Sequence, residues 1–333
     1  MRRREVIAAL GGAMACWAGL GPVAAQPFAR GTRVGFLHPR LSAVVEALRL
    51  VAIREGLGIS GQNSDPLELV SRVSDGNLDR LAAYARELAA LRVDVIIAIS
   101  PSGVRAAREA TATIPIVAVD LETDPVASGL AKSLGQPGGN VTGVFLDLAE
   151  ICAKCLQLLD EVIPRLTQVA ILWDPSTGPY QLAAVEKAAA ADGTTLLGTT
   201  LLIHRADTID QVDVAFRSIR DEQSQAVLML SSPLFAGNSA RVAEFAARDR
   251  LPAITLFPEF ARNGGLLAYG PDLQALFRQG GAIARRILQG TEPQNLPIER
   301  PSRFEMVVNA KTGRHLGLAF PTSLLAFADE VIE

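Results

Sequence analysis

Short apolar runs without period-2 alternation recur along this chain, and stretches with helical periodicity separate them. Ile114–Val119 and Val93–Ile99 are two of these runs. Such a run is typical of a parallel strand that is buried on both faces of a sheet. Asn77–Leu91 shows the other pattern, since its apolar residues recur on one face of a helix. Because strands and helices alternate along most of the chain, we predict parallel sheets with helices on both faces.

The alternation falls into two sets, and Gly135–Asn140, which breaks regular structure, separates them. A chain of 333 residues is also long for a single core. We therefore predict an α/β fold with two doubly wound parallel-sheet lobes joined by a hinge. The expected first lobe comprises residues 31–145 and 271–295, and the second comprises 146–270 and 296–333. The pattern further predicts a helix after Ser42 with Val45, Leu48, Val51 and Ala52 at helical spacing, a short helix after Pro125, and a segment at Gly264–Gly270 that crosses back.

Residues 1–25 have the pattern of a secretory signal peptide. Arg2–Arg4 form a basic start, and an uncharged stretch follows that ends in the small residues Val23–Ala25. Arg3–Ile7 also resembles a loose twin-arginine export signal. An uncleaved membrane anchor is the alternative, because the uncharged stretch is long enough to span a bilayer. We expect cleavage near Ala25 and a soluble periplasmic protein, since no later stretch is long and apolar enough to span.

Several function classes lack their sequence signals. No cluster of Lys and Arg follows the first residues, so nucleic acid is not an expected partner. The chain has no G-x-x-x-x-G-K phosphate loop and no G-x-S-x-G nucleophile elbow. Its histidines have no metal-ligand spacing, and Cys152 and Cys155 lie in a predicted helix, where we expect a packed or reduced pair. We therefore expect no catalytic residue, no metal and no cofactor.

Polar residues follow several predicted strands, at the carboxyl edge where open α/β sheets bind ligands. Ser100 and Ser102 suit an anionic group, and Asp120, Thr123 and Asp124 offer acceptors to an amino or hydroxyl group. Helix capping is the alternative role for such residues. The candidate ligand-binding residues are His38, Ser100, Ser102, Asp120, Thr123, Asp124, Asp174, Ser176, Thr177, Ser231, Ser232 and Phe235.

Aromatic residues near strand ends leave two interpretations open. They stack on an aromatic ligand, or they belong to the core, which is the commoner role at such positions. The four residues are Trp173, Phe257, Phe260 and Tyr269.

Segments along nearly the whole chain, in order, resemble one protein family. They resemble the periplasmic substrate-binding proteins of ABC transporters, specifically the tryptophan/tyrosine-type branch. Departures occur at His38–Arg40, at the two cysteines and at Asn63–Val73. The matching segments are MRRREVIAALGG at the start, GQN at Gly61–Asn63, Asp75–Ala98, ATIPIVAVDLETDPVASGL, QPGGNVTGV, LPAITLFPEFARNGGLLAYGPDL, PSRFEMVVNAKTGRHLGLAFP and LLAFADEVIE.

The resemblance implies a type I periplasmic binding protein fold and a monomeric binding protein. It implies capture of a small polar solute, such as an amino acid or related carboxylate, hinge closure, and delivery to an ABC permease. Two alternatives stay open. The first is a periplasmic sensing protein that presents its solute to a receptor. The second is an exported α/β enzyme, for which Asp120 and Asp174 would be the carboxylate pair.

Overall fold

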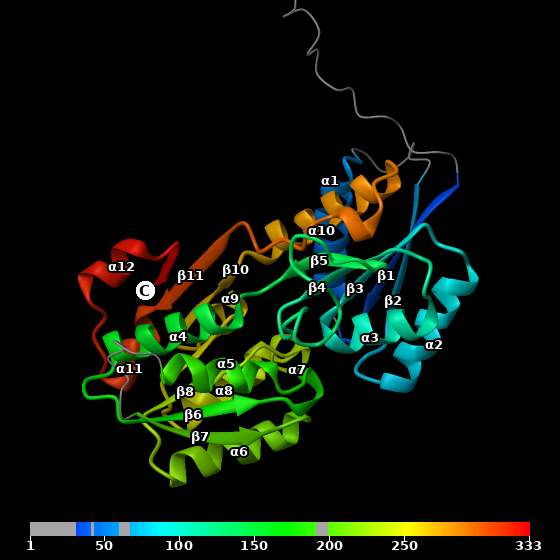
Figure 1. Cartoon of the computed structure of the whole chain (residues 1–333). Helices are drawn as coiled ribbons and strands as arrows, with labels where there is room; N and C mark the ends of the chain where they lie inside the picture. Colours follow the sequence, from blue (N-terminus) through cyan, green and yellow to red (C-terminus); the bar gives the residue numbers. More distant parts are fainter. Residues whose placement is uncertain (1–30, 41–42, 60–66, 191–198) are drawn as a thin grey trace, which may run out of the picture.

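The computed structural model describes residues 31–40, 43–59, 67–190 and 199–333. They form two lobes, each built on its own sheet (Figure 1). The predicted signal peptide at 1–25 and the export signal within it lie outside the described residues. Within those residues, no helix combines the length and apolar character that a membrane span requires.

The first lobe has a five-stranded parallel sheet in the order β2-β1-β3-β4-β5. All residues of β3 and β4 are buried, as their unbroken apolar runs predict. Alternate strand residues pack on opposite faces, one face against α2 and α3 and the other against α1 and α10. The bounds are β1 Thr32–His38, α1 Ala43–Leu57, β2 Leu67–Val73, α2 Leu78–Ala90, β3 Val95–Ile99, α3 Ser100–Ala110, β4 Ile116–Asp120, β5 Val141–Phe145 and α10 Leu273–Leu288.

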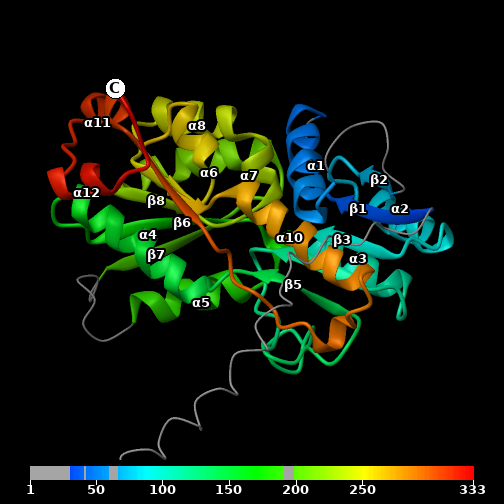
Figure 2. The same ribbon diagram turned by 90° about the horizontal axis from the view of Figure 1, so that it is seen from above.

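The second lobe has a seven-stranded sheet in the order β12-β11-β10-β9-β8-β6-β7. Helices α6 and α8 cover one face and α4 and α5 the other (Figure 2). This sheet is mixed, because β11 runs antiparallel to β10. The bounds are α4 Leu148–Val162, β6 Gln168–Trp173, η1 Pro175–Thr177, α5 Tyr180–Ala189, β7 Thr200–Arg205, α6 Ile209–Asp221, β8 Ala226–Met229, α7 Pro233–Gly237, α8 Ser239–Arg248, β9 Ala253–Thr255, α9 Pro258–Arg262, β10 Leu267–Pro271, η2 Pro293–Asn295, β11 Phe304–Asn309, α11 Ala310–Leu316, α12 Thr322–Phe327 and β12 Glu330–Ile332.

The chain passes between the lobes three times, after β5, after β10 and before β11. The second passage brings α10 back to lie beside α1 (Figure 2). Glycines let these helices approach closely, since a Cβ on Gly281 would lie 2.3 Å from the Ile53 carbonyl oxygen. After α10, the Glu299 backbone N–H donates to the Gly143 carbonyl at 2.9 Å, so the first lobe still holds the chain there.

Two local predictions are wrong. No helix follows Pro125: the segment forms turns, because Asp124 caps a single turn and Gly129 then adopts a φ of 70°. The predicted helix after Ser42 is present as α1, although its Leu48 and Val51 are 53% and 54% exposed because the Gly56 face packs on α10. The segment at Gly264–Gly270 does not cross back, since β10 belongs to the second sheet and the passage follows it.

Candidate functional site

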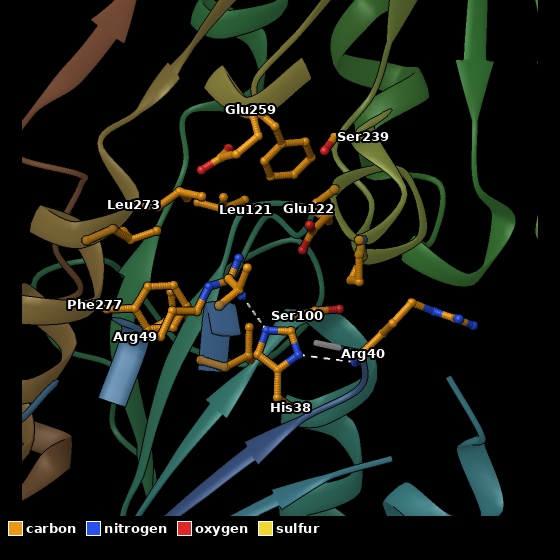
Figure 3. A pocket seen from close by; sticks show the side chains of 18 residues that line it. His38, Arg40, Arg49, Ser100, Leu121, Glu122, Ser239, Glu259, Leu273 and Phe277 are labelled. Atoms are coloured by element: carbon orange, nitrogen blue, oxygen red, sulfur yellow. Dashed lines mark hydrogen bonds between the residues drawn. The ribbon is translucent and has the colours of Figure 1, made fainter. Parts of the chain in front are cut away.

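A cavity of about 220 Å³ lies between the lobes (Figure 3). The first lobe contributes the carboxyl ends of β1, β3 and β4, together with α1 and α10. The second lobe contributes α7, the start of α8 and the residues after β9. Most of the lining is apolar, and its charged and polar side chains are His38, Arg40, Arg49, Ser100, Glu122, Ser239 and Glu259.

Ser100 lies at the wall of this cavity, where β3 ends and α3 begins. Its backbone is in the left-handed region, with a φ of 67°, which is costly for a residue with a side chain. No side-chain hydrogen bond caps α3 among the described residues, so Ser100 and Ser102 do not have that structural role. The free N–H groups of a helix start favour a negative group. Ser102, two residues further along α3, is buried and does not line this cavity.

Arg49 projects from α1 into the cavity, where its guanidinium lies over the Phe277 ring at 4.7 Å (Figure 3). Its Nη1 is 2.6 Å from Nε2 of His38. Burial lowers the pKa of Arg49 to about 10, so the side chain is still a cation at neutral pH. Burial and the Arg49 charge hold the pKa of His38 well below its usual value, so the imidazole is neutral. Within the described residues, Arg49 makes no ion pair with a carboxylate.

Glu122 is buried at the end of β4 and joins the lobes. Its Oε1 accepts a hydrogen bond from the Ser231 hydroxyl of the second lobe at 2.6 Å. Burial and the nearby Asp120 charge raise the pKa of Glu122, and burial raises that of Asp120. Asp120 is fully buried, and its Oδ1 accepts from the backbone N–H groups of Glu122 and Thr123. The β4 end therefore holds two carboxyl groups out of water.

The predicted residues of the second lobe mostly bond to one another. The Ser232 hydroxyl donates to Asp174 Oδ2 at 2.5 Å, and the Ser176 N–H donates to Asp174 Oδ1 at 2.9 Å. Thr177 donates its hydroxyl hydrogen to the Asp174 carbonyl. Phe235 is buried in the core of this lobe. These contacts stabilise the loops after β6 and β8 and leave Asp174 away from the 220 Å³ cavity.

The structure thus divides the predicted residues between several places. His38 and Ser100 line the cavity between the lobes, and Ser231 contacts Glu122 at its edge. A second cavity of about 690 Å³, beside η1, is lined by Asp120, Thr123, Ser176 and Thr177. Asp124 is exposed and caps its own turn, accepting from the N–H groups of residues 126 and 127.

Sequence reasoning did not select Arg49, Glu122 or Glu259 as site residues. Arg49 and Glu259 occupy helices, where a charged side chain is usually read as solvent-facing. Glu122 had a usable signal, since it follows the end of a buried strand by two residues. Among the aromatic residues, Phe257 lines the cavity, whereas Trp173, Phe260 and Tyr269 pack in or against the core.

Two α/β lobes on parallel sheets, with a cavity where their strand ends meet, define a type I periplasmic binding protein fold. The chain belongs to the ABC transporter substrate binding protein family, whose sequence profile matches residues 39–332. The resemblance seen in the sequence is therefore confirmed. This is a family of substrate-binding proteins, so the protein is a binding protein and not an enzyme.

Individual relatives are distant. A tyrosine-binding protein of Clostridioides difficile is 24% identical over 259 residues, which are 77% of this chain and 72% of that protein. The structure of an ABC domain in complex with L-Trp from Streptococcus pneumonia superposes with a TM-score of 0.79 at 23% identity, covering 90% of this chain and 99% of the other. A ligand-free, open substrate-binding protein from Clostridium difficile gives 0.63 at 22% identity, with the same coverage. These likenesses establish the fold.

Proposed function

We propose that this protein is the exported solute-binding component of an ABC transporter. It captures a small polar solute, an amino acid or related carboxylate, between its lobes and delivers it to a membrane permease. Family membership supports the transporter role. The names of two relatives, one tyrosine-binding and one bound to L-Trp, support an amino acid. The start of the sequence supports export with cleavage near Ala25, and we propose a monomer that acts in the periplasm.

The position of Arg49 is the observation that supports a carboxylate group on the solute. Its guanidinium lines the interlobe cavity and forms no ion pair among the described residues, although the charge of Glu259 in the same cavity acts on it. A guanidinium out of water needs acceptors, and a carboxylate matches its planar pair of N–H groups. Ser100 adds the start of α3 at the same wall, where a negative group is favoured. One end of the solute therefore is an anion.

We expect the lobes to close over the solute, because both lobes contribute side chains to the cavity wall. The cavity combines side chains of both lobes, and the Ser231–Glu122 hydrogen bond crosses between them. A solute that touches both walls does so only in the closed arrangement, so it shifts the population toward closure. The three chain passages between the lobes provide the hinge.

Calorimetry and thermal unfolding of the mature protein against amino acids and related carboxylic acids test this function. A solute at 100 times its dissociation constant adds about 2.7 kcal/mol to the free energy of unfolding. Arg49→Met removes the cation and keeps an apolar chain over Phe277, and we expect affinity to fall by about tenfold or more. Arg86→Met, at an exposed position on α2, is the matched control and leaves affinity unchanged.

Two outcomes contradict the proposal. The first is that no carboxylate-bearing compound of the library binds. The second is that the Arg49 variant binds as tightly as the wild type, which would place the anion elsewhere.

A further inference from the structure

Asp120 and Glu122, called here the carboxyl pair, lie two residues apart at the end of β4. Asp120 has no exposed surface and Glu122 is 4% exposed. Each carboxyl group has one oxygen that accepts protein hydrogen bonds: Asp120 Oδ1 from backbone N–H groups, and Glu122 Oε1 from Ser231. Within the described residues, the other two oxygens, Asp120 Oδ2 and Glu122 Oε2, receive none. Two acceptor oxygens are thus buried without a donor at hydrogen-bond geometry, and the neighbouring Thr123 hydroxyl is buried without a partner as well.

Two neighbouring carboxyl groups that are both buried repel each other when both are ionised, so the doubly charged state is energetically costly. A proton shared by the pair resolves the repulsion, as in other carboxyl pairs, and supplies the missing donor. A cation does the same. No protein cation already neutralises the pair, since no arginine or lysine among the described residues forms an ion pair with either carboxyl group.

Glu122 is the member of the pair that faces the solute. Its carboxyl group points into the interlobe cavity, and so does the Arg49 guanidinium (Figure 3). The other titratable side chains around the cavity are Arg40, the neutral His38 and the exposed Glu259. Asp120 lies at the wall of the second cavity with no exposed surface, and the other charged residues of that wall are Arg105, Arg108 and Glu109. The solute cavity therefore has a cation at one wall and a buried carboxyl at another.

Resting on the proposed function, we propose that the solute is a zwitterion whose ammonium group binds the Glu122 carboxyl group as the lobes close and takes the place of the proton shared by the carboxyl pair. The carboxylate of the same solute meets Arg49. The ammonium group stays protonated, so the pair changes from one negative charge to two and one proton leaves to the buffer. The ionised Glu122 then accepts a stronger, charge-assisted hydrogen bond from Ser231, which links solute charge to closure. The ligand class is the α-amino acid or a close analogue, not a simple carboxylic acid.

Titration calorimetry with matched probes tests the proposal. The probes are L-amino acids, L-tryptophan and L-tyrosine among them, each paired with the acid that lacks only the amino group. We expect the amino acid to bind at least tenfold more tightly. The binding heat should differ between phosphate and Tris at pH 7, because these buffers take up the released proton with different enthalpies.

Glu122→Gln separates the subsite from the fold. The amide keeps an oxygen for Ser231 and offers N–H groups to Asp120, so it mimics the protonated form and should fold. The expected result is loss of the preference for the amino group and of the buffer dependence, with the affinity for the des-amino acid unchanged. Glu186→Gln, at an exposed position on α5 outside both cavities, is the control and should keep both properties.

The other outcomes contradict either the ammonium subsite or the proposed function. If the des-amino acid binds the wild type as tightly as the amino acid, the ammonium subsite is wrong while the carboxylate-binding function stands. The same holds if Glu122→Gln keeps the tenfold preference, or if Glu186→Gln loses it as well. If no acid of either kind binds, the proposed function itself falls.

Discussion

Nε2 of His38 lies 2.6 Å from Nη1 of Arg49, and Nδ1 of the same ring accepts from the Arg40 backbone N–H at 3.1 Å. Both neighbours are donors, but a neutral imidazole has only one acceptor nitrogen. One of the two contacts therefore places N–H against N–H. Protonating the ring would put donors against both neighbours, which opposes the charged form in addition to burial, the larger cause of the lowered pKa.

This arrangement predicts that His38 stays neutral in the folded protein when the solution is acidified. NMR of the ring protons from pH 8 to pH 5 should show no titration of the His38 signal, which a His38→Gln variant identifies by its loss. A His38 signal that titrates near 6.5, the usual value, would contradict the structure.

Stability should fall as pH rises through the neutral range because of the carboxyl pair. The pKa of Glu122 is raised from 4.5 to about 8, so the folded state keeps a proton that the unfolded state loses. The contribution of Glu122 is complete below about pH 4.5 and is lost as pH approaches 8. His38 acts oppositely below 6.5, since its lowered pKa favours the folded state at higher pH.

Comparing variants isolates the Glu122 contribution, because His38 is common to both. The midpoint of thermal unfolding should be flatter from pH 6.5 to 8 in Glu122→Gln than in the wild type. Parallel curves for the two proteins would show that Glu122 is ionised throughout this range.

Neighbouring serines should have separable roles. Ser231→Ala removes a bond between the lobes, so affinity should fall about fivefold, for a loss of about 1 kcal/mol, with little change in stability. Ser232→Ala removes contacts within the second lobe, to Asp174 and to the start of α7, so stability should fall by about 1–2 kcal/mol. Denaturant unfolding and calorimetry distinguish the two, and exchanged phenotypes would contradict the assignment.

The α1–α10 contact should not tolerate a side chain at Gly281. An alanine Cβ there would lie 2.3 Å from the Ile53 carbonyl oxygen, which is rigid backbone, so we expect a loss of about 2–3 kcal/mol. At Gly280 the nearest atom is a Val119 methyl at 3.1 Å, which a small shift accommodates. Gly280→Ala should therefore change the free energy of unfolding by about 1 kcal/mol or less, and equal losses at both sites would refute the packing argument.

Export remains to be tested directly. Cell fractionation followed by amino-terminal sequencing should find a soluble periplasmic form that begins near Gln26. Full-length protein held firmly in the membrane would instead support the anchor alternative.

Much of the fold could be predicted from strand patterns. A strand that is buried on both faces, such as Val95–Ile99, is a short unbroken run of apolar residues, and such runs recur between helical stretches along this chain. The site was harder. Asp120 and Ser100 could be placed at strand ends, but not in particular cavities, because that depends on how the lobes meet. Arg49 shows the limit most clearly: its position beside Phe277 depends on a helix far along the chain, and no local pattern records that contact.

Because the chain passes three times between the lobes, the lobes need little contact energy to close on each other. Free partners lose about 4–15 kcal/mol of translational and rotational freedom when they associate. Covalently tethered lobes have already given up that freedom, and each presents its face to the other at a high effective concentration. A weak contact such as Ser231 to Glu122 is then enough to shift the equilibrium between open and closed lobes. This covalent connection suits the proposed solute-binding role, in which the protein releases its solute as readily as it binds it.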